Sequence, residues 1–120
     1  MGFMRSLSLA WSGILHAVRT ERHMKVHLTA AVAVTALGAI LDLSSLEWAA
    51  LVFAMGLVFV AELVNTAIER AVDLASGGER HPLAKQAKDA SAGAVLVCAV
   101  VAVIIGFLVL GPPLWRLLTT

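Results

Sequence analysis

Long apolar stretches separated by short polar connections dominate the pattern of this chain. Three of them are long enough for the roughly 20 helical residues that cross a membrane, and they lie at 24–43, 46–75 and 83–111. The pattern predicts an all-α integral membrane protein, with three transmembrane helices in a single membrane domain over residues 1–120.

Residues that favour helix ends punctuate these stretches. Ser45 is expected to cap the start of the second helix, and Gly77-Gly78 to end it. Pro82 suits the first turn of the third helix, whereas Pro112-Pro113 should end it, because proline lacks the N–H that a helix interior needs.

The N-terminal segment has a different, two-sided pattern. Over 3–19, apolar residues such as Phe3, Leu7 and Trp11 recur at helical spacing, while Arg5 and His16 fall mostly on the other side. An amphipathic helix of this kind lies in the membrane interface and does not cross it. We therefore expect an interfacial helix before the three spans.

Composition agrees with a membrane protein, and the charges predict its orientation. The chain is 60% hydrophobic and 14% charged, whereas soluble domains are about 45–50% apolar and about 25% charged. The net charge of +1 gives no reason to expect a nucleic-acid partner, and the sequence has no Walker loop. Positive residues favour the cytoplasmic side, and eight of the nine lie before the first span or around the connection after the second: Arg5, Arg19, Arg22, Lys25, Arg70, Arg80, Lys85 and Lys88. The N-terminus and the second connection are thus expected in the cytoplasm and the C-terminus outside.

One narrow polar stripe interrupts the second apolar stretch. Glu62, Asn65, Glu69 and Asp73 are spaced by three or four residues, which returns each to nearly the same helix face. An acidic group inside a membrane span is costly and usually marks a functional site. The alternative is a stripe that only joins helices by hydrogen bonds, with Asp73 paired to Arg70 three residues before it.

The residue types in and near this stripe suit phosphoryl transfer. Glu69 and Glu21 offer the hard oxygen ligands that Mg²⁺ prefers, and Lys88 offers a positive charge for phosphates. Glu62 lies deepest, where it can act as a general base on the hydroxyl of a lipid, with Asn65 as its neighbour. Phosphoryl transfer needs mainly positioning and charge neutralisation, so we expect a kinase that acts on a lipid alcohol.

Other functions stay open. An intramembrane glutamate is also typical of small proton-coupled transporters, although Glu62 lies toward one end of its span. A catalytically inactive scaffold would keep the same fold. His23 and His27 have a spacing of four that can bind a metal, but no third ligand is evident.

Two blocks of the chain resemble the prokaryotic diacylglycerol kinase and undecaprenol kinase family. They are ELVNTAIERAVDL (62–74) and HPLAKQAKDASAGAVL (81–96), with WSGI and TER near the N-terminus. The resemblance implies a homotrimer in the bacterial inner membrane, with an interfacial helix and three spans per subunit. It also implies active sites between subunits that use Mg²⁺ and ATP.

The same resemblance implies a role for each matching residue. Glu62 would be the catalytic base beside Asn65, Glu21 and Glu69 would hold Mg²⁺ near the nucleotide, and Lys88 and Asp89 would contact the nucleotide. The remaining nucleotide-binding positions would be Glu79, Arg80, His81 and Arg5, and Arg5 would also contact the lipid.

The connecting segments look more similar to the undecaprenol kinase branch than to the diacylglycerol branch. These segments are TERHMKVH (20–27) and SGGERHPLAK (76–85). We therefore expect ATP-dependent phosphorylation of undecaprenol, with diacylglycerol as the alternative substrate.

Overall fold

The computed structural model describes residues 2–120, and all regular structure within them is helical. The four helices are α1 (Phe3–Thr20), α2 (Arg22–Ile40), α3 (Ser45–Ser76) and α4 (Pro82–Thr119). By length and composition α2, α3 and α4 are able to cross a membrane.

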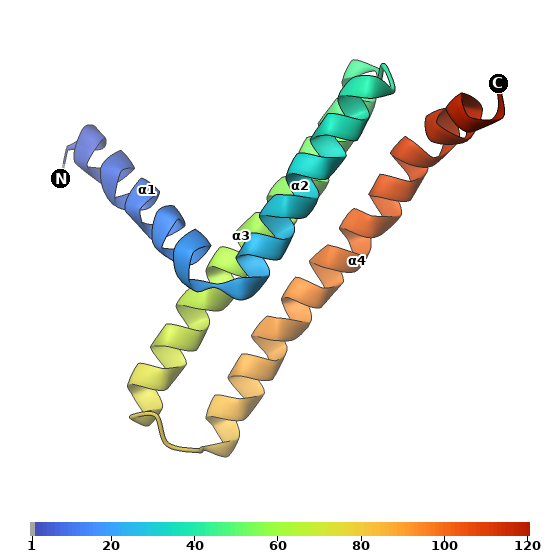
Figure 1. Ribbon diagram of the computed structural model, residues 1–120. Helices are drawn as coiled ribbons and strands as arrows, with labels where there is room; N and C mark the ends of the chain where they lie inside the picture. Colours follow the sequence, from blue (N-terminus) through green and yellow to red (C-terminus); the bar gives the residue numbers. More distant parts are fainter. Residues whose placement is uncertain (1) are drawn as a thin grey trace.

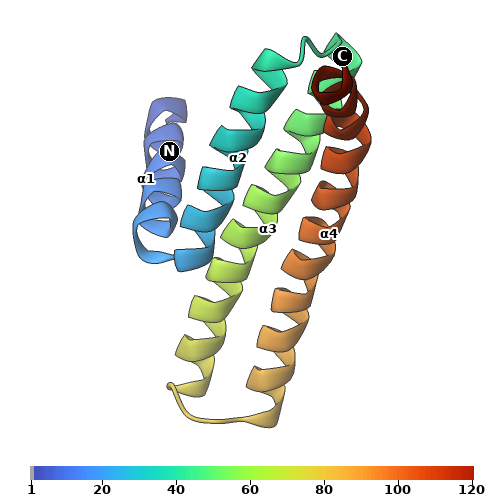
Figure 2. The same ribbon diagram turned by 45° about the vertical axis from the view of Figure 1, so that its right-hand side comes forward.

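Three of the helices form a layer, and α1 leaves it at an angle (Figure 1). Turned by 45°, the view shows α2, α3 and α4 side by side with α3 in the middle (Figure 2). The most extensive packing is between α3 and α4. Both of these helices continue well beyond the α1–α2 junction, toward the connection that joins them (Figures 1 and 2).

A single non-helical residue separates α1 from α2. Glu21 has extended backbone angles (φ −98°, ψ 119°), and helix resumes at Arg22. The polar segment expected to precede the first span is thus already helical. Polar side chains favour contact with water, but they do not by themselves end a helix. At its other end α2 stops at Ile40, three residues before the predicted end at position 43, and Asp42 turns the chain with a left-handed φ of 54°.

The cap of α3 is one residue earlier than predicted. Ser44, and not Ser45, accepts a hydrogen bond from the backbone N–H of Glu47 at 3.2 Å. The Glu47 carboxylate accepts one in return from the Ser44 backbone N–H at 3.1 Å. This reciprocal capping box needs a glutamate three residues after the cap, and only Ser44 has Glu47 at that spacing.

At the other end of α3, the two glycines act as predicted. Gly77 and Gly78 both have positive φ, 64° and 78°, which costs glycine little because it lacks a Cβ. The Gly78 N–H donates to the Asp73 carbonyl at 3.0 Å, which satisfies one of the last carbonyls of the helix.

The prediction that Pro112-Pro113 ends the last helix was wrong. Helix α4 continues through both prolines to Thr119. A proline pair removes two backbone N–H donors, but the turns on either side keep their donors, so the helix can continue. The ribbon changes direction near this end (Figure 1). The Thr119 hydroxyl donates to the Trp115 carbonyl at 2.8 Å and supports the last turn.

The chain buries few apolar side chains and exposes many. Met24 and Leu51 are the largest that are fully buried, whereas Phe53 is 68% exposed and Phe107 is 74% exposed. Such an apolar exterior is unfavourable in water but suits contact with lipid or with other helices in a membrane.

The two candidate caps of α3 give a direct test of this geometry. We expect Ser44→Ala to lower the free energy of unfolding by about 1 kcal/mol, the usual loss for a removed N-cap. Ser45→Ala is the matched control and should change it much less. Thermal or denaturant unfolding of the detergent-solubilised protein measures both, and a larger loss for Ser45→Ala would show that the cap is misassigned.

Candidate active site

The polar stripe lies on one face of α3 and runs from a buried end to an exposed end. Glu62 is buried, with a residue exposure of 3%. Asn65 and Glu69 are half-buried, and Asp73 is exposed. The stripe therefore connects the interior of the helical layer to the part of α3 that projects beyond the α1–α2 junction.

The deepest member of the stripe pairs with a residue whose role the sequence did not reveal. His27 on α2 places Nε2 at 3.0 Å from Oε1 of Glu62. The sequence suggests His27 only as a metal ligand together with His23, because a pairing with Glu62 across 35 residues is a tertiary contact that local spacing does not show. One signal was available: a buried carboxylate needs a partner, and His27 is one of few polar residues at a matching depth of the preceding span.

The middle of the stripe is joined within α3. The Asn65 side-chain N–H donates to Glu69 Oε1 at 3.2 Å, and the Thr66 hydroxyl donates to the Glu62 carbonyl at 3.0 Å. The Asn65 side-chain oxygen is buried and has no hydrogen-bond partner. The amide and Glu69 therefore present hard oxygen atoms within one turn of helix.

At the exposed end, the stripe and its neighbour bond to other elements. Arg70 donates to Glu21 at 2.8 Å, which ties the α1–α2 junction to α3. Asp73 pairs with Lys88 of α4. The alternative pairing of Asp73 with Arg70 along α3 is therefore wrong, because each charge has a partner on another element.

The remaining predicted residues lie apart from this cluster. Glu79, Arg80 and His81 occupy the exposed connection between α3 and α4, where His81 accepts a hydrogen bond from the Leu83 N–H at 3.1 Å and caps α4. Asp89 is paired with Lys85 one turn before it. Arg5 is exposed on α1, near the end that points away from the bundle (Figure 1).

The stripe offers metal-ligand oxygens at Glu69 and Asn65 but not a complete metal site. Within residues 2–120, no group of three or more His, Cys, Asp or Glu side chains is placed to hold a metal ion. Glu69 and the unpartnered Asn65 oxygen are nevertheless of the chemical type that Mg²⁺ selects, and Mg²⁺ usually takes one or two carboxylates plus substrate phosphates. The donor set thus fits a metal ion that arrives with a phosphate ligand.

Comparisons with known proteins identify the family of this chain. Residues 8–110 match the family described as prokaryotic diacylglycerol kinase. The chain is 47% identical over 112 residues to the undecaprenol kinase of Bacillus subtilis (strain 168), covering 93% of this chain and 90% of that protein.

Two further relatives are diacylglycerol kinases. Identity to the one from Synechocystis sp. (strain ATCC 27184 / PCC 6803 / Kazusa) is 43% over 113 residues, which is 94% of this chain and 65% of that protein. Identity to the one from Escherichia coli (strain K12) is 33% over 106 residues, 86% of each chain. With three helices able to span a membrane and a carboxylate stripe in the middle one, this chain belongs to the prokaryotic diacylglycerol kinase family and is a lipid kinase of the bacterial membrane.

Proposed function

We propose that this protein transfers the γ-phosphate of ATP to the hydroxyl of undecaprenol, giving undecaprenyl phosphate and ADP. The substrate rests on one observation, the 47% identity to an undecaprenol kinase over nearly the full length of both chains. The chemistry rests on Glu62, a carboxylate held at 3% exposure inside an apolar helix, where a group of this kind serves function by default.

In the proposed reaction, the lipid hydroxyl oxygen attacks the γ-phosphorus. The new P–O bond forms as the bond from the γ-phosphorus to the β–γ bridging oxygen breaks, and ADP leaves with the electron pair of that bond. The hydroxyl proton passes to the Glu62 carboxylate, which acts as the general base. Asn65, one turn nearer the exposed end of the stripe, orients the reacting groups.

Charge neutralisation falls to the exposed end of the stripe. Lys88 contacts the phosphates after exchanging its bond to Asp73, and Asp89 lines the same site. Glu21 and Glu69 would hold Mg²⁺, which neutralises charge on the phosphate oxygens when it is bound. Four further residues complete the nucleotide site in this proposal, with Arg5 also facing the lipid: Glu79, Arg80, His81 and Arg5.

The proposal includes a membrane orientation and an assembly. The N-terminus and the α3–α4 connection face the cytoplasm, where ATP is available, and the C-terminus lies outside. Helix α1 lies in the interface, which its exposed apolar residues support, with Phe3 at 78% and Trp11 at 60% exposure. The protein works as a homotrimer with sites shared between subunits, and its exposed apolar helix surfaces suit such contacts.

Diacylglycerol is the second candidate substrate, because relatives at 43% and 33% identity are diacylglycerol kinases. The reaction and the roles of Glu62 and Lys88 are the same for either lipid, so only the product differs. The alternative of a proton-coupled transporter has no comparable support, since the relatives of this chain are kinases.

The first prediction concerns the base. We expect the purified protein in mixed micelles to phosphorylate undecaprenol in preference to diacylglycerol, and Glu62→Gln to lower kcat by about 10²–10⁴-fold, the usual contribution of a general base. Transfer of labelled phosphate from ATP to each lipid, side by side, measures both effects.

Each outcome of this assay has a separate meaning. Preference for diacylglycerol would overturn the substrate and keep the mechanism. Full activity of Glu62→Gln would exclude this carboxylate as the base. No transfer to either lipid by assembled wild-type protein with Mg²⁺ present would favour the inactive scaffold.

The second prediction concerns Lys88. Its side chain is 41% exposed and that of Asp73 is 53% exposed, and an exposed ion pair contributes only about 0–1 kcal/mol, so exchange for a phosphate costs little. Lys88→Met should therefore raise the KM for ATP while the KM for the lipid stays within about twofold, because the lost charge contacts phosphate only.

The control for this variant is Lys25→Met, which removes an exposed positive charge from α2. Initial rates at varied ATP and at varied lipid separate the two KM values. An equal rise in the KM for ATP in both variants would show that the loss of any positive surface charge has this effect, and Lys88 would then have no specific role.

A further inference from the structure

The partner of Glu62 occupies a distinctive position. His27 reaches Glu62 from a different helix, with Nε2 at 3.0 Å from Oε1. The His27 side chain is 24% exposed, whereas that of Glu62 is only 5% exposed. His27 therefore lies between the buried carboxylate and the surroundings of the helical layer.

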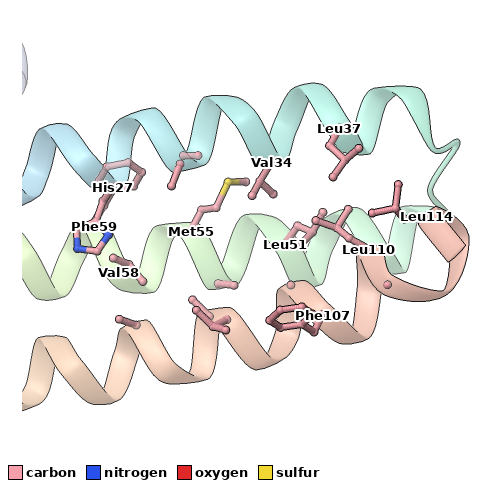
Figure 3. Close-up of a pocket in the computed structure, with 18 residues that line it drawn as sticks. His27, Val34, Leu37, Leu51, Met55, Val58, Phe59, Phe107, Leu110 and Leu114 are labelled. Atoms are coloured by element: carbon pink, nitrogen blue, oxygen red, sulfur yellow. The ribbon is translucent and has the colours of Figure 1, made fainter. Parts of the chain in front are cut away.

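Those surroundings are an apolar groove. It has a volume of about 480 Å³, and it is lined by residues of α2, α3 and α4. His27 and Phe59 lie at one end of it and Leu114 at the other (Figure 3). Among the described residues that line it, His27 is the only titratable one, so a lipid alcohol whose chain follows this groove meets His27 at its polar end. Glu62 does not line the groove and is joined to this end by its bond to His27.

We propose that His27 is a positioning residue for the base: its Nε2–H holds Oε1 of Glu62, so that Oε2 faces the lipid hydroxyl and accepts its proton. An ionised carboxylate only accepts hydrogen bonds, which assigns the proton of this bond to His27 Nε2. A base oriented by a third group is a common arrangement in enzymes. This inference rests on the proposed function, because it assigns a role within the same reaction.

Within residues 2–120, the two neighbouring donors on α3 do not bond to the Glu62 carboxylate. The Thr66 hydroxyl, one turn along α3, donates to the backbone carbonyl of Glu62 and not to its carboxylate. The Asn65 amide donates to Glu69. The carboxylate orientation therefore depends on His27, and a displacement of about 1 Å at a reacting group can cost about 10²-fold in rate.

The experiment compares three substitutions of His27 in the same mixed-micelle assay. His27→Phe keeps a ring without a donor, His27→Met keeps apolar volume without a donor, and His27→Gln keeps an N–H at a similar distance from the backbone. We expect the two variants without a donor to lower kcat by about 10–10²-fold, with the KM for ATP and for the lipid within about twofold. His27→Gln should recover kcat to within about fivefold of wild type, because the hydrogen bond is restored.

Two controls make the result specific. His23→Phe changes an exposed histidine one turn earlier on α2 and should keep the wild-type kcat. Size-exclusion elution of each variant in detergent separates loss of activity from loss of assembly. If His27→Phe does not assemble, the kcat of His27→Met tests the proposal in its place.

The possible failures are distinguishable. If wild-type protein transfers no phosphate, the proposed function fails and not this inference alone. If wild type is active and both variants without a donor keep its kcat, His27 does not position the base. A rise confined to the KM for the lipid would show that His27 only contacts the substrate, and equal losses in the Gln and Phe variants would show that the hydrogen bond is not the cause; either result overturns the proposal.

Discussion

The desolvation of one carboxylate constrains the rest of this structure. A lone carboxylate moved from water into an apolar interior costs several kcal/mol even after relaxation, so Glu62 at 3% exposure requires a donor. His27 supplies that donor at 3.0 Å. Because the two residues belong to different helices, the bond also fixes the register of α2 against α3, and with it the position of the α1–α2 junction beside Arg70.

The polar contacts weaken as the stripe leaves the interior. The Glu62–His27 bond is the least exposed, the Glu21–Arg70 pair is more exposed, and both side chains of the Asp73–Lys88 pair are more than two-fifths exposed. Exposed pairs contribute little to stability and exchange partners easily. Under the proposed function this gradient suits a kinase, because the base would keep one orientation while the groups that contact phosphates would bind and release a charged nucleotide in every cycle.

Local sequence signals predicted the parts of this structure that depend on neighbours in the chain. Helical periodicity placed Glu62, Asn65, Glu69 and Asp73 on one face of α3, and two glycines marked its end. The cap lies at Ser44 and not at the predicted Ser45, because only Ser44 has a glutamate three residues later to complete the capping box. Local propensity also predicts that Pro112-Pro113 ends the last helix, but α4 continues through the pair, because a helix that loses donors at one turn can continue when the following turns keep theirs.

Contacts between helices could not be predicted from these local signals. The partners of Arg70 and Asp73 are Glu21 and Lys88, each on another element, and spacing along one helix favoured the wrong pair. Charge alone does not rank such alternatives, because several residues of opposite sign lie at the same end of the molecule. The buried end was more predictable in principle, since few polar residues exist at that depth and each needs a partner.

The membrane explains why an open groove can lead to the buried pair. In water, an apolar groove beside a small core would favour collapse of the helices onto each other. In a bilayer, lipid chains are as apolar as the groove lining, so no hydrophobic force closes it. Helix α3 is then held to α2 and α4 by packing and a few polar contacts, and the groove lined by α2, α3 and α4 stays open with His27 at one end. Under the proposed function, the apolar exterior and the buried carboxylate are therefore two consequences of one requirement, that a reaction with a water-soluble phosphate donor take place on a lipid that stays in the membrane.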